Sequence, residues 1–447
     1  MRSCFSLFVH SHEPKVLVLP GDDGWSLPSF PAQYITDLNR TVSDWLGTAA
    51  ITLRCLLDQE RYGDAGGPLI YLHEPQAVPQ LPAGARWLAL ADLASTAIVP
   101  ADHQRIVASV LWELEGGPER PDRAQWEQRG WHREACGWLA DEMAQLGHQV
   151  TGPTEQVQVR VWSCVLRAST TRGDVYLKAS PACTRFESAL TGALADWQPD
   201  HIPEVLAVNP DRDWLLLASA GELMRPLLPE NPLTMWKDAL AAYAQLQIAL
   251  VPHADAALAL GCPDRRLAGL TAQFVALCDE LEVLPVQNGA DLARDDLPQL
   301  RAFAPQVRAM CAQLAATGFP ETLHHDDLHP GNICLRGEQY VVFDWGECAI
   351  THPLLSLFIP LRWARIIGGM PDDMLAQLTE AYCAPWRIAL PQADIAAALP
   401  VAQRLAVLSR ALSWGALARA APVDDRWESL DSALYWLRLF VTGIETD

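Results

Sequence analysis

Hydrophobic positions in the first hundred residues follow short strand and helix patterns. The apolar, β-branched run "KVLVLP" at 15–20 ends in proline, which predicts a strand. Residues 35–47 carry apolar side chains at helical spacing and end in glycine, which predicts a helix. The short apolar core of "MRSCFSLFVHSHEPK" predicts a first strand and not a signal peptide. Further strands are predicted at "AAITLRCLLDQE", "GGPLIYLHE" and "ARWLAL". Residues 1–102 are therefore expected to form a compact α+β domain.

The pattern changes twice further along the chain. Within 103–152, "HQRIVASVLWELEG" and "WHREACGWLADEMAQLG" are amphipathic, which predicts a helical connector. From 153 to 225 strand patterns dominate, in "EQVQVRVWSCVLRAST", "VYLKAS", "PEVLAVNP" and "DWLLLASAGE", with one helix, "CTRFESALTGALADW". Residues 226–447 are almost entirely helical in pattern. The expected order is an α+β domain, a connector, a strand-rich region and a helical region.

Composition narrows the class of protein. The chain has 447 residues, enough for several domains, and no run of eighteen apolar residues, so no membrane segment is expected. The net charge of -21 argues against a nucleic-acid partner. Eleven cysteines without a CxxC pair indicate reduced thiols and a cytoplasmic location.

The candidate chemistry is concentrated in "HHDDLHPGNICLRGEQYVVFDWGE" at 324–347. The overlapping stretch "ETLHHDDLHPGN" at 321–332 is too polar and too rich in proline and glycine for a helix or buried strand, so it is expected to be a loop. Asp327 and Asn332 then face Asp344, which ends a short strand. Phosphoryl transfer needs one carboxylate to accept the proton of the attacking hydroxyl. It also needs oxygen ligands, here a second carboxylate and an amide, to hold Mg²⁺ between the phosphates.

The motifs "HDDLHPGN" and "VVFDWGE" resemble the Brenner motif and the metal-binding motif of the aminoglycoside phosphotransferase and choline kinase-like families. These are small-molecule kinases with a protein-kinase-like fold. Their pattern His-x-Asp-x-x-x-x-Asn maps onto His325, Asp327 and Asn332. The resemblance implies that Asp327 is the catalytic base and that Asn332 and Asp344 bind magnesium. It also implies that His325 holds the loop backbone.

This sequence departs from the family pattern at two positions. Asp326 stands where glycine is usual, and we interpret it as a turn or capping residue. Ser356 replaces a second, mainly structural aspartate, so a local change without loss of catalysis is expected. For His329 we favour a role in pinning the loop, and for His352 a role in capping or orienting the next helix.

A kinase also needs a lysine on a central strand to hold the phosphates, paired with a glutamate from the following helix. Lys178 in "DVYLKAS" is the only lysine in this region, and Glu187 follows nine residues later in a predicted helix. A lone strand lysine is more often a solvated edge residue, but the motif downstream favours the functional interpretation. "EQVQVRVWSCVLRAS" and "DVYLKA" also resemble the N-terminal lobe of the family. The expected fold is thus a two-lobe kinase-like one, with an antiparallel β N-lobe and a helical C-lobe.

Two further parts of the nucleotide site, the turn over the phosphates and the hinge that binds adenine, are predicted from their position in the strand-rich region. The turn that would cover the phosphates lies around Ser163 and has no glycine, a feature common in the aminoglycoside phosphotransferase group. The hinge is expected in "WLLLASAGE", where the backbone from Leu217 to Ser219 would bind adenine. An ordinary buried strand explains these leucines equally well.

The layout of the first domain resembles a Nudix fold. Aligning Arg40 with the arginine of the Nudix box places Thr41, Asp44 and Trp45 at its glutamate positions. One acidic residue of three remains, so a binding or scaffolding domain without hydrolase activity is expected.

Three functions remain to be compared. The first is an ATP-dependent, Mg²⁺-dependent phosphotransferase acting on a hydroxyl of a small molecule. The second is a catalytically inactive nucleotide-binding regulatory protein, which the complete residue set opposes. The third is a Nudix hydrolase, which the missing glutamates oppose. Acidic groups near the reacting centre, Glu347 and Asp326, suggest a cationic acceptor.

Overall fold

The computed structural model describes residues 2–32, 34–58, 69–117, 123–285, 294–423 and 425–443. The chain divides into two compact units, Met1–Pro181 and Ala182–Asp447. The domain boundaries expected at residues 102, 152 and 225 stay predictions.

The first part of unit 1 contains a mixed four-stranded sheet and a smaller three-stranded sheet. Its elements are β1 (Arg2–Phe8), β2 (Lys15–Gly21), β3 (Gly24–Ser26), β4 (Ser29–Ala32), α1 (Ile35–Leu46), β5 (Ala50–Asp58), β6 (Leu69–Pro75) and β7 (Arg86–Ala89). The strand orders are β4-β1-β6-β5 and β3-β2-β7. β1 and β6 pair in parallel, and α1 buries Leu38, Val42 and Leu46. The strands and the helix predicted here are confirmed.

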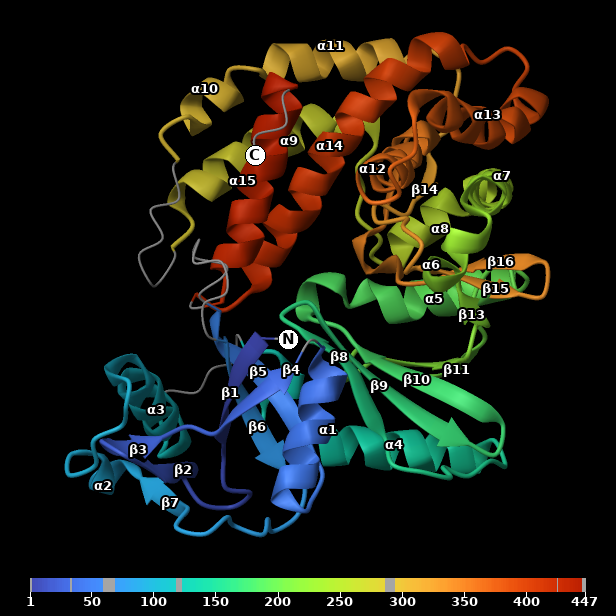
Figure 1. Cartoon of the computed structure of the whole chain (residues 1–447). Helices are drawn as coiled ribbons and strands as arrows, with labels where there is room; N and C mark the ends of the chain where they lie inside the picture. The colour runs from blue at the N-terminus through green and yellow to red at the C-terminus, as the bar shows by residue number, and fades with distance from the viewer. Residues whose placement is uncertain are drawn as a thin grey trace. The chain divides into compact units, whose positions relative to one another are not determined.

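The second part of unit 1 is helical and then strand-rich. Its elements are α2 (Leu90–Leu93), α3 (Ala101–Leu114), η2 (Gln125–Glu127), α4 (Trp131–Gln145), β8 (Glu155–Arg160), β9 (Ser163–Thr170) and β10 (Gly173–Ala179). β8, β9 and β10 form an antiparallel meander (Figure 1). The two helices predicted in the connector are confirmed as α3 and α4.

Unit 2 begins with a helix and a hairpin and is otherwise mainly helical. Its elements are η3 (Ala182–Thr184), α5 (Phe186–Trp197), β11 (Val205–Asn209), β12 (Trp214–Ala218), β13 (Glu222–Leu223), α6 (Met224–Leu227), η4 (Leu228–Glu230), α7 (Pro232–Leu250), η5 (Val251–His253), α8 (Ala254–Ala259), α9 (Leu267–Val283), α10 (Leu297–Arg301), α11 (Ala304–Ala315), β14 (Thr322–His324), β15 (Ile333–Arg336), β16 (Gln339–Val342), η6 (Trp345–Glu347), β17 (Ala349–Thr351), η7 (Pro353–Leu357), α12 (Phe358–Ile366), α13 (Asp372–Ala389), α14 (Ile395–Ala420) and α15 (Trp427–Thr442). Helices α14 and α15 lie side by side (Figure 1).

One local prediction is wrong. The stretch from Thr322 to His324 was expected to be loop, but it forms the strand β14, which pairs antiparallel with β17. Its partner lies 25 or more residues further along the chain, so the pairing has no local signature. This pairing anchors the start of the loop that carries Asp327.

Helix α14 is the main apolar helix of unit 2. Among the described residues it alone is long and apolar enough to cross a membrane by length and composition, but 56% of that stretch is buried inside the protein. That burial is the pattern of a core helix, so the observation is weak evidence for a membrane span. It also means that any charged residue on the buried face of α14 needs partners.

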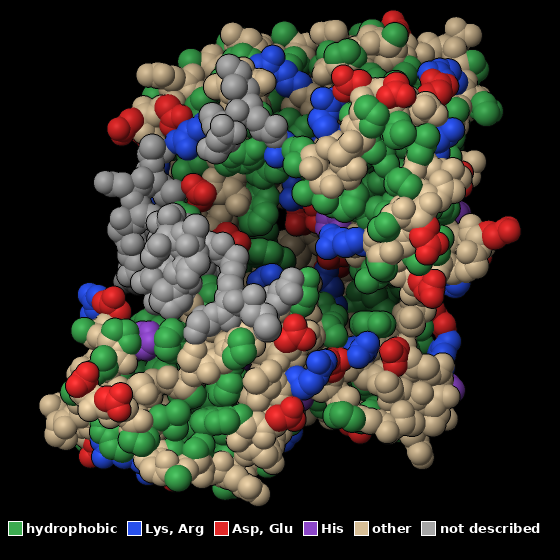
Figure 2. Space-filling model, in the orientation of Figure 1, with side chains coloured by type: hydrophobic (Ala, Val, Ile, Leu, Met, Phe, Trp, Pro, Cys, Tyr) green, Lys and Arg blue, Asp and Glu red, His purple; other side chains and the backbone are tan. Residues whose placement is uncertain are grey.

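None of the eleven cysteines, all of which lie among the described residues, forms a disulfide. On the face shown in Figure 2, acidic and basic side chains of the described residues are interspersed with apolar ones. The net charge of -21 is therefore not gathered into one large acidic patch on that face.

Candidate active site

The loop between β14 and β15 brings two of the predicted site residues together. Asn332 Nδ2 donates hydrogen bonds to the backbone oxygen of Asp327 at 3.0 Å and to its Oδ2 at 3.4 Å. Asn332 is 6% exposed, whereas the Asp327 side chain is 26% exposed. The asparagine thus holds the loop closed while the Asp327 carboxylate remains accessible.

His325 joins this loop to the strand end that carries Asp344. Its Nε2 donates to the backbone oxygen of Phe343 at 2.9 Å, and its Nδ1 accepts from the backbone N–H of Asp327 at 3.3 Å. Burial lowers the pKa of His325 to about 4, so the ring is neutral and can donate on one side and accept on the other. Phe343 also donates its N–H to the backbone oxygen of Asn332 at 3.1 Å. Asp344, the next residue, is thereby placed at the loop.

His329 shapes the second half of the loop. Its Nδ1 accepts from the backbone N–H of Gly331 at 2.9 Å, and its Nε2 lies 3.5 Å from Asp327 Oδ2. A Cβ at position 331 would lie 2.7 Å from the His329 ring, so only glycine fits there. His329 pins the loop as predicted.

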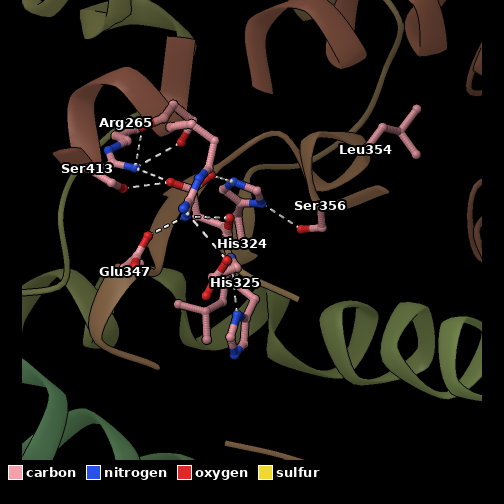
Figure 3. Close-up of polar contacts among 12 residues, drawn as sticks. Arg265, His324, His325, Glu347, Leu354, Ser356 and Ser413 are labelled. Carbon is pink, nitrogen blue, oxygen red and sulfur yellow. Dashed lines mark hydrogen bonds and ion pairs between the residues drawn. The ribbon is translucent and has the colours of Figure 1, made fainter. Parts of the chain in front are cut away.

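Asp326 is buried, with 2% of its surface exposed, and its two carboxylate oxygens are fully engaged (Figure 3). Arg265 Nη1 donates to Oδ2 at 2.9 Å and the Ser413 hydroxyl donates to the same oxygen at 2.6 Å. His324 Nε2 donates to Oδ1 at 3.0 Å. Burial by itself raises the pKa of Asp326, but His324 and the nearby arginines outweigh burial and hold it below its usual range.

The backbone of Asp326 has a φ of 61°, in the left-handed region. This conformation explains why a glycine suits the position and why aspartate is tolerated there. The turn role predicted for Asp326 is thus present, and its carboxylate serves a buried ionic network in addition. Because that carboxylate faces inward, the suggestion that Asp326 attracts a cationic acceptor is wrong.

Ser356 continues the network on the other side of His324. Its Oγ lies 2.7 Å from His324 Nδ1 (Figure 3). The same oxygen accepts a hydrogen bond from Gln247 Nε2 at 3.0 Å. Ser356 thus forms hydrogen bonds with His324 and Gln247. These bonds are the local change expected where the family usually has an aspartate. His352 accepts from the backbone N–H of Leu354 and caps η7, as predicted.

Arg410 of α14 is a residue that the sequence analysis missed. Its side chain is 6% exposed, and its Nη1 donates to the backbone oxygen of Asp326 at 3.0 Å and to Glu347 Oε2. Its Nη2 lies 3.7 Å from Asp327 Oδ1. The available signal was Arg410 as the one charged residue in the apolar stretch "LAVLSRALSWGALA", because a buried cation needs an anionic partner.

The charges around Asp327 oppose one another. Burial raises the pKa of Asp327, Arg410 lowers it, and Asp344 raises it; the net direction is upward. Burial also raises the pKa of Glu347 to about 7 despite Arg410. A carboxylate with a raised pKa is a better general base, so the arrangement suits removal of a hydroxyl proton at Asp327.

The region that contains these residues matches a known protein family. Residues 178–395 match the model of the family described as the phosphotransferase enzyme family. This segment is similar to that family. The match includes the loop of Asp327, the strand end of Asp344 and Lys178, and it confirms the predicted phosphotransferase class and protein-kinase-like fold class.

No curated protein matches the chain. Among solved structures, it is similar to a choline/ethanolamine kinase family protein from Mesorhizobium loti, at 21% identity and a TM-score of 0.44, over 70% of this chain and 95% of that chain. It is also similar to a Plasmodium vivax ethanolamine kinase, at 10% identity and a TM-score of 0.49, over 79% and 98% of the two chains. A macrolide 2'-phosphotransferase type I shows 14% identity and a TM-score of 0.41, over 64% and 97%. At such values the likenesses say nothing about the substrate.

In the phosphotransferase segment, Lys178 lies on β10 between the buried residues Leu177 and Ala179, in register with Val165. Glu187 lies in the first turn of α5 and is 2% exposed. A Cβ added at Gly346 would lie 2.9 Å from Glu187 Oε2, so this carboxylate sits against the turn that follows Asp344. The pairing of Lys178 with Glu187 stays a prediction.

The other predicted nucleotide contacts also stay predictions. Ser163 begins β9, is 2% exposed, and accepts a hydrogen bond from Gln158 Nε2 at 2.6 Å. Leu217 lies near the end of β12, and Ser219 follows that strand and is exposed. The burial of the Ser163 hydroxyl makes it the least accessible of the three.

The phosphotransferase fold implies a magnesium site, and the donor set fits one. No group of three or more His, Cys, Asp or Glu side chains that could hold a metal occurs among the described residues. Mg²⁺ does not require such a group, since it commonly binds one or two protein oxygen ligands together with substrate phosphates and water. The hydrogen bonds of Asn332 to Asp327 use its Nδ2 and leave the amide oxygen for a cation.

Proposed function

We propose that this protein is an ATP-dependent phosphotransferase that transfers the γ-phosphate to a hydroxyl of a small molecule. The observation that supports it best is the pair of contacts made by His325, to Phe343 and to Asp327. Together they hold the proposed base and the proposed metal ligand Asp344 on one rigid frame, as positioning of reactants requires.

Each residue has a defined task in this proposal. Asp327 accepts the proton of the acceptor hydroxyl as the oxygen attacks the γ-phosphate. Asn332 and Asp344 would hold Mg²⁺, which when bound neutralises the charge of the transferring phosphoryl group. Lys178, oriented by Glu187, would bind the α- and β-phosphates. The hinge from Leu217 to Ser219 would bind the base.

Nucleotide binding is the first test. We expect MgATP to raise the melting temperature of the wild-type protein and to fail to do so in Lys178→Met and Asp344→Asn. Lys237→Met, on α7 outside the predicted site, is the matched control and is expected to respond as wild type does. A wild-type protein that does not respond to any nucleotide would contradict the proposal.

Transfer is the second test. Asp327→Asn is expected to keep nucleotide binding and to lose at least about a hundredfold in kcat, the range of a general base. The assay would follow ADP release and the phosphorylated product with hydroxylated acceptors, including aminoglycosides, macrolides, choline and ethanolamine. Nucleotide binding without transfer to any acceptor would favour the catalytically inactive alternative.

The charge of the acceptor is left open by the geometry. Asp326 faces inward and Glu347 pairs with Arg410, so neither supports a cationic acceptor as the sequence suggested. The screen should therefore include neutral and anionic hydroxyl compounds at equal depth. A cytoplasmic location remains part of the proposal, since none of the eleven cysteines, all among the described residues, forms a disulfide.

The N-terminal region has no assigned activity in this proposal. Helix α1 contains Arg40 and Asp44, the two positions that fit the Nudix box, and Arg40 is 66% exposed. A binding or scaffolding role for residues 1–102 stays a prediction. Diphosphate hydrolysis that survives Asp327→Ala would contradict it.

A further inference from the structure

Arg410 contacts groups of Asp326, Asp327 and Glu347, all of which lie far from it in the sequence. Its Nη1 donates to the backbone oxygen of Asp326 at 3.0 Å, immediately before the proposed base. The same nitrogen donates to Glu347, and Nη2 lies 3.7 Å from Asp327 Oδ1. One guanidinium therefore contacts the backbone oxygen of the residue just before the base and lies beside the carboxylate of the base.

The guanidinium has little freedom to leave this position. Its side chain is 6% exposed, and its Cζ lies 6.0 Å from the ring centre of Trp414 and 5.9 Å from that of Trp436. A planar guanidinium offers several donors in fixed directions, whereas a lysine ammonium is a single compact charge. The contacts with Asp326 and Glu347 at one nitrogen therefore fix where the other nitrogen points.

Glu347 sets how strongly Arg410 binds the base. If Arg410 had no other anionic partner, it would be expected to close onto Asp327 in a hydrogen-bonded pair. The observed separation of 3.7 Å between Nη2 and Asp327 Oδ1 is longer than such a hydrogen bond. The oxygens of Asp327 thus remain able to accept a proton from a hydroxyl.

We propose that Arg410 is a positioning residue for phosphoryl transfer: it orients the backbone and carboxylate of Asp327, and Glu347 keeps it from binding that carboxylate directly. This inference rests on the proposed function. Arg265 serves the neighbouring carboxylate of Asp326 instead, so the two buried arginines have separate tasks.

The test compares substitutions at Arg410 with a matched arginine on the same helix. Arg404 also lies on α14 and donates to two backbone oxygens, those of Phe440 at 3.2 Å and Val441 at 2.9 Å. Wild type, Arg410→Lys, Arg410→Met and Arg404→Met would be assayed for MgATP affinity and for steady-state phosphate release from MgATP, with water as the acceptor. Melting temperature and folded fraction would be measured for each.

We expect Arg410→Met to lower kcat by about a hundredfold, the effect of a small misplacement of a catalytic group, with an unchanged Kd for MgATP. Arg410→Lys is expected to keep the charge but recover only part of the rate. Arg404→Met is expected to keep the wild-type kcat. Methylguanidinium added to Arg410→Ala is expected to restore part of the lost rate, which a purely structural role would not allow.

Arg410→Met leaves Glu347 buried without its cation, which can cause misfolding. The double variant Arg410→Met/Glu347→Met is the control for that effect. It removes both charges, and it is expected to fold and to remain slow. A wild-type kcat per folded molecule in either Arg410→Met variant would overturn the inference and leave the proposed function standing. Absence of both MgATP binding and phosphate release in the wild type would overturn the proposed function, and the inference with it.

Discussion

Each unit of the chain buries a connected set of polar side chains, and the two sets differ in charge. In unit 1, His73 contacts the hydroxyls of Ser6 at 3.1 Å and Thr52 at 3.3 Å. Gln156 then pairs with the backbone of Thr52, donating to its oxygen at 2.8 Å and accepting from its N–H at 3.0 Å. Every group in this set is neutral, because burial lowers the pKa of His73 to about 3.

In unit 2 the corresponding set is ionic. Asp326 is held by Arg265, and Glu347 is held by Arg410, all within the core beneath the loop of Asp327. A buried ion pair contributes little net stability compared with apolar packing, because both charges lose their hydration. A neutral network is enough to join two strands, as in unit 1. The buried charges of unit 2 lie beside the proposed base, which fits a part in placing that reactive carboxylate.

The largest expected effect is in the ionic set. Asp326→Asn keeps a residue that tolerates the left-handed backbone but leaves Arg265 without its anion, which should cost about 3–5 kcal/mol of unfolding free energy. The matched control is Asp213→Asn, since Asp213 also has a positive φ, 53°, and an arginine partner at 3.7 Å, but one that is 66% exposed. It should cost less than about 1 kcal/mol. Equal costs in denaturant titrations would remove the distinction between the two sets.

The neutral set should be less sensitive. Gln156→Leu leaves the buried backbone N–H and oxygen of Thr52 without partners, which should cost about 1–3 kcal/mol. Gln158→Leu loses only a bond to the Ser163 hydroxyl and should cost less. Urea unfolding of both variants measures the difference. A cost for Gln156→Leu as large as that of Asp326→Asn would show that charge is not the deciding factor.

Acid should act on the neutral set through His73. The unfolded chain takes up a proton at this residue below pH 6.5, whereas the folded chain does so only near pH 3. The stability that neutral His73 provides is thus complete above pH 6.5 and is lost as the pH falls toward 3. His73→Gln should reduce the slope of stability against pH in that window by up to about 1.4 kcal/mol per pH unit. His12→Gln, at an exposed position, should leave the slope unchanged, and unchanged slopes in both variants would contradict the assignment.

The smallest expected effect comes from two serines of the unit 2 set, of which only Ser413 is bonded to the Asp326 carboxylate. Ser356→Ala removes a hydroxyl bound to His324 and Gln247 and should cost about 0.5–1.5 kcal/mol. Ser413→Ala removes a bond to the Asp326 carboxylate and should cost about 1.5–3 kcal/mol. Thermal unfolding of both variants measures the two costs. A larger cost for Ser356→Ala than for Ser413→Ala would contradict the expected role of the carboxylate.

Much of the fold followed from local pattern, because strand alternation, helical spacing and the glycine stop at Gly47 act over a few residues. The predicted positions of Asp327, Asn332 and Asp344 were also local, since their spacing lies within one loop and one strand. β14 was missed because its partner β17 is distant in the sequence. Arg410 was missed because nothing near it in the sequence reveals a carboxylate.

The sequence by itself determined most of the element types, the phosphotransferase motif and the residues proposed to act in it. Only the tertiary structure decided that Asp326 turns inward to Arg265 and Ser413, and that Arg410 meets both Glu347 and the loop of Asp327. The physical reason is that motif chemistry depends on spacing along the chain. The partners of a buried charge depend instead on which distant helix packs against it, and no short stretch of sequence encodes that packing.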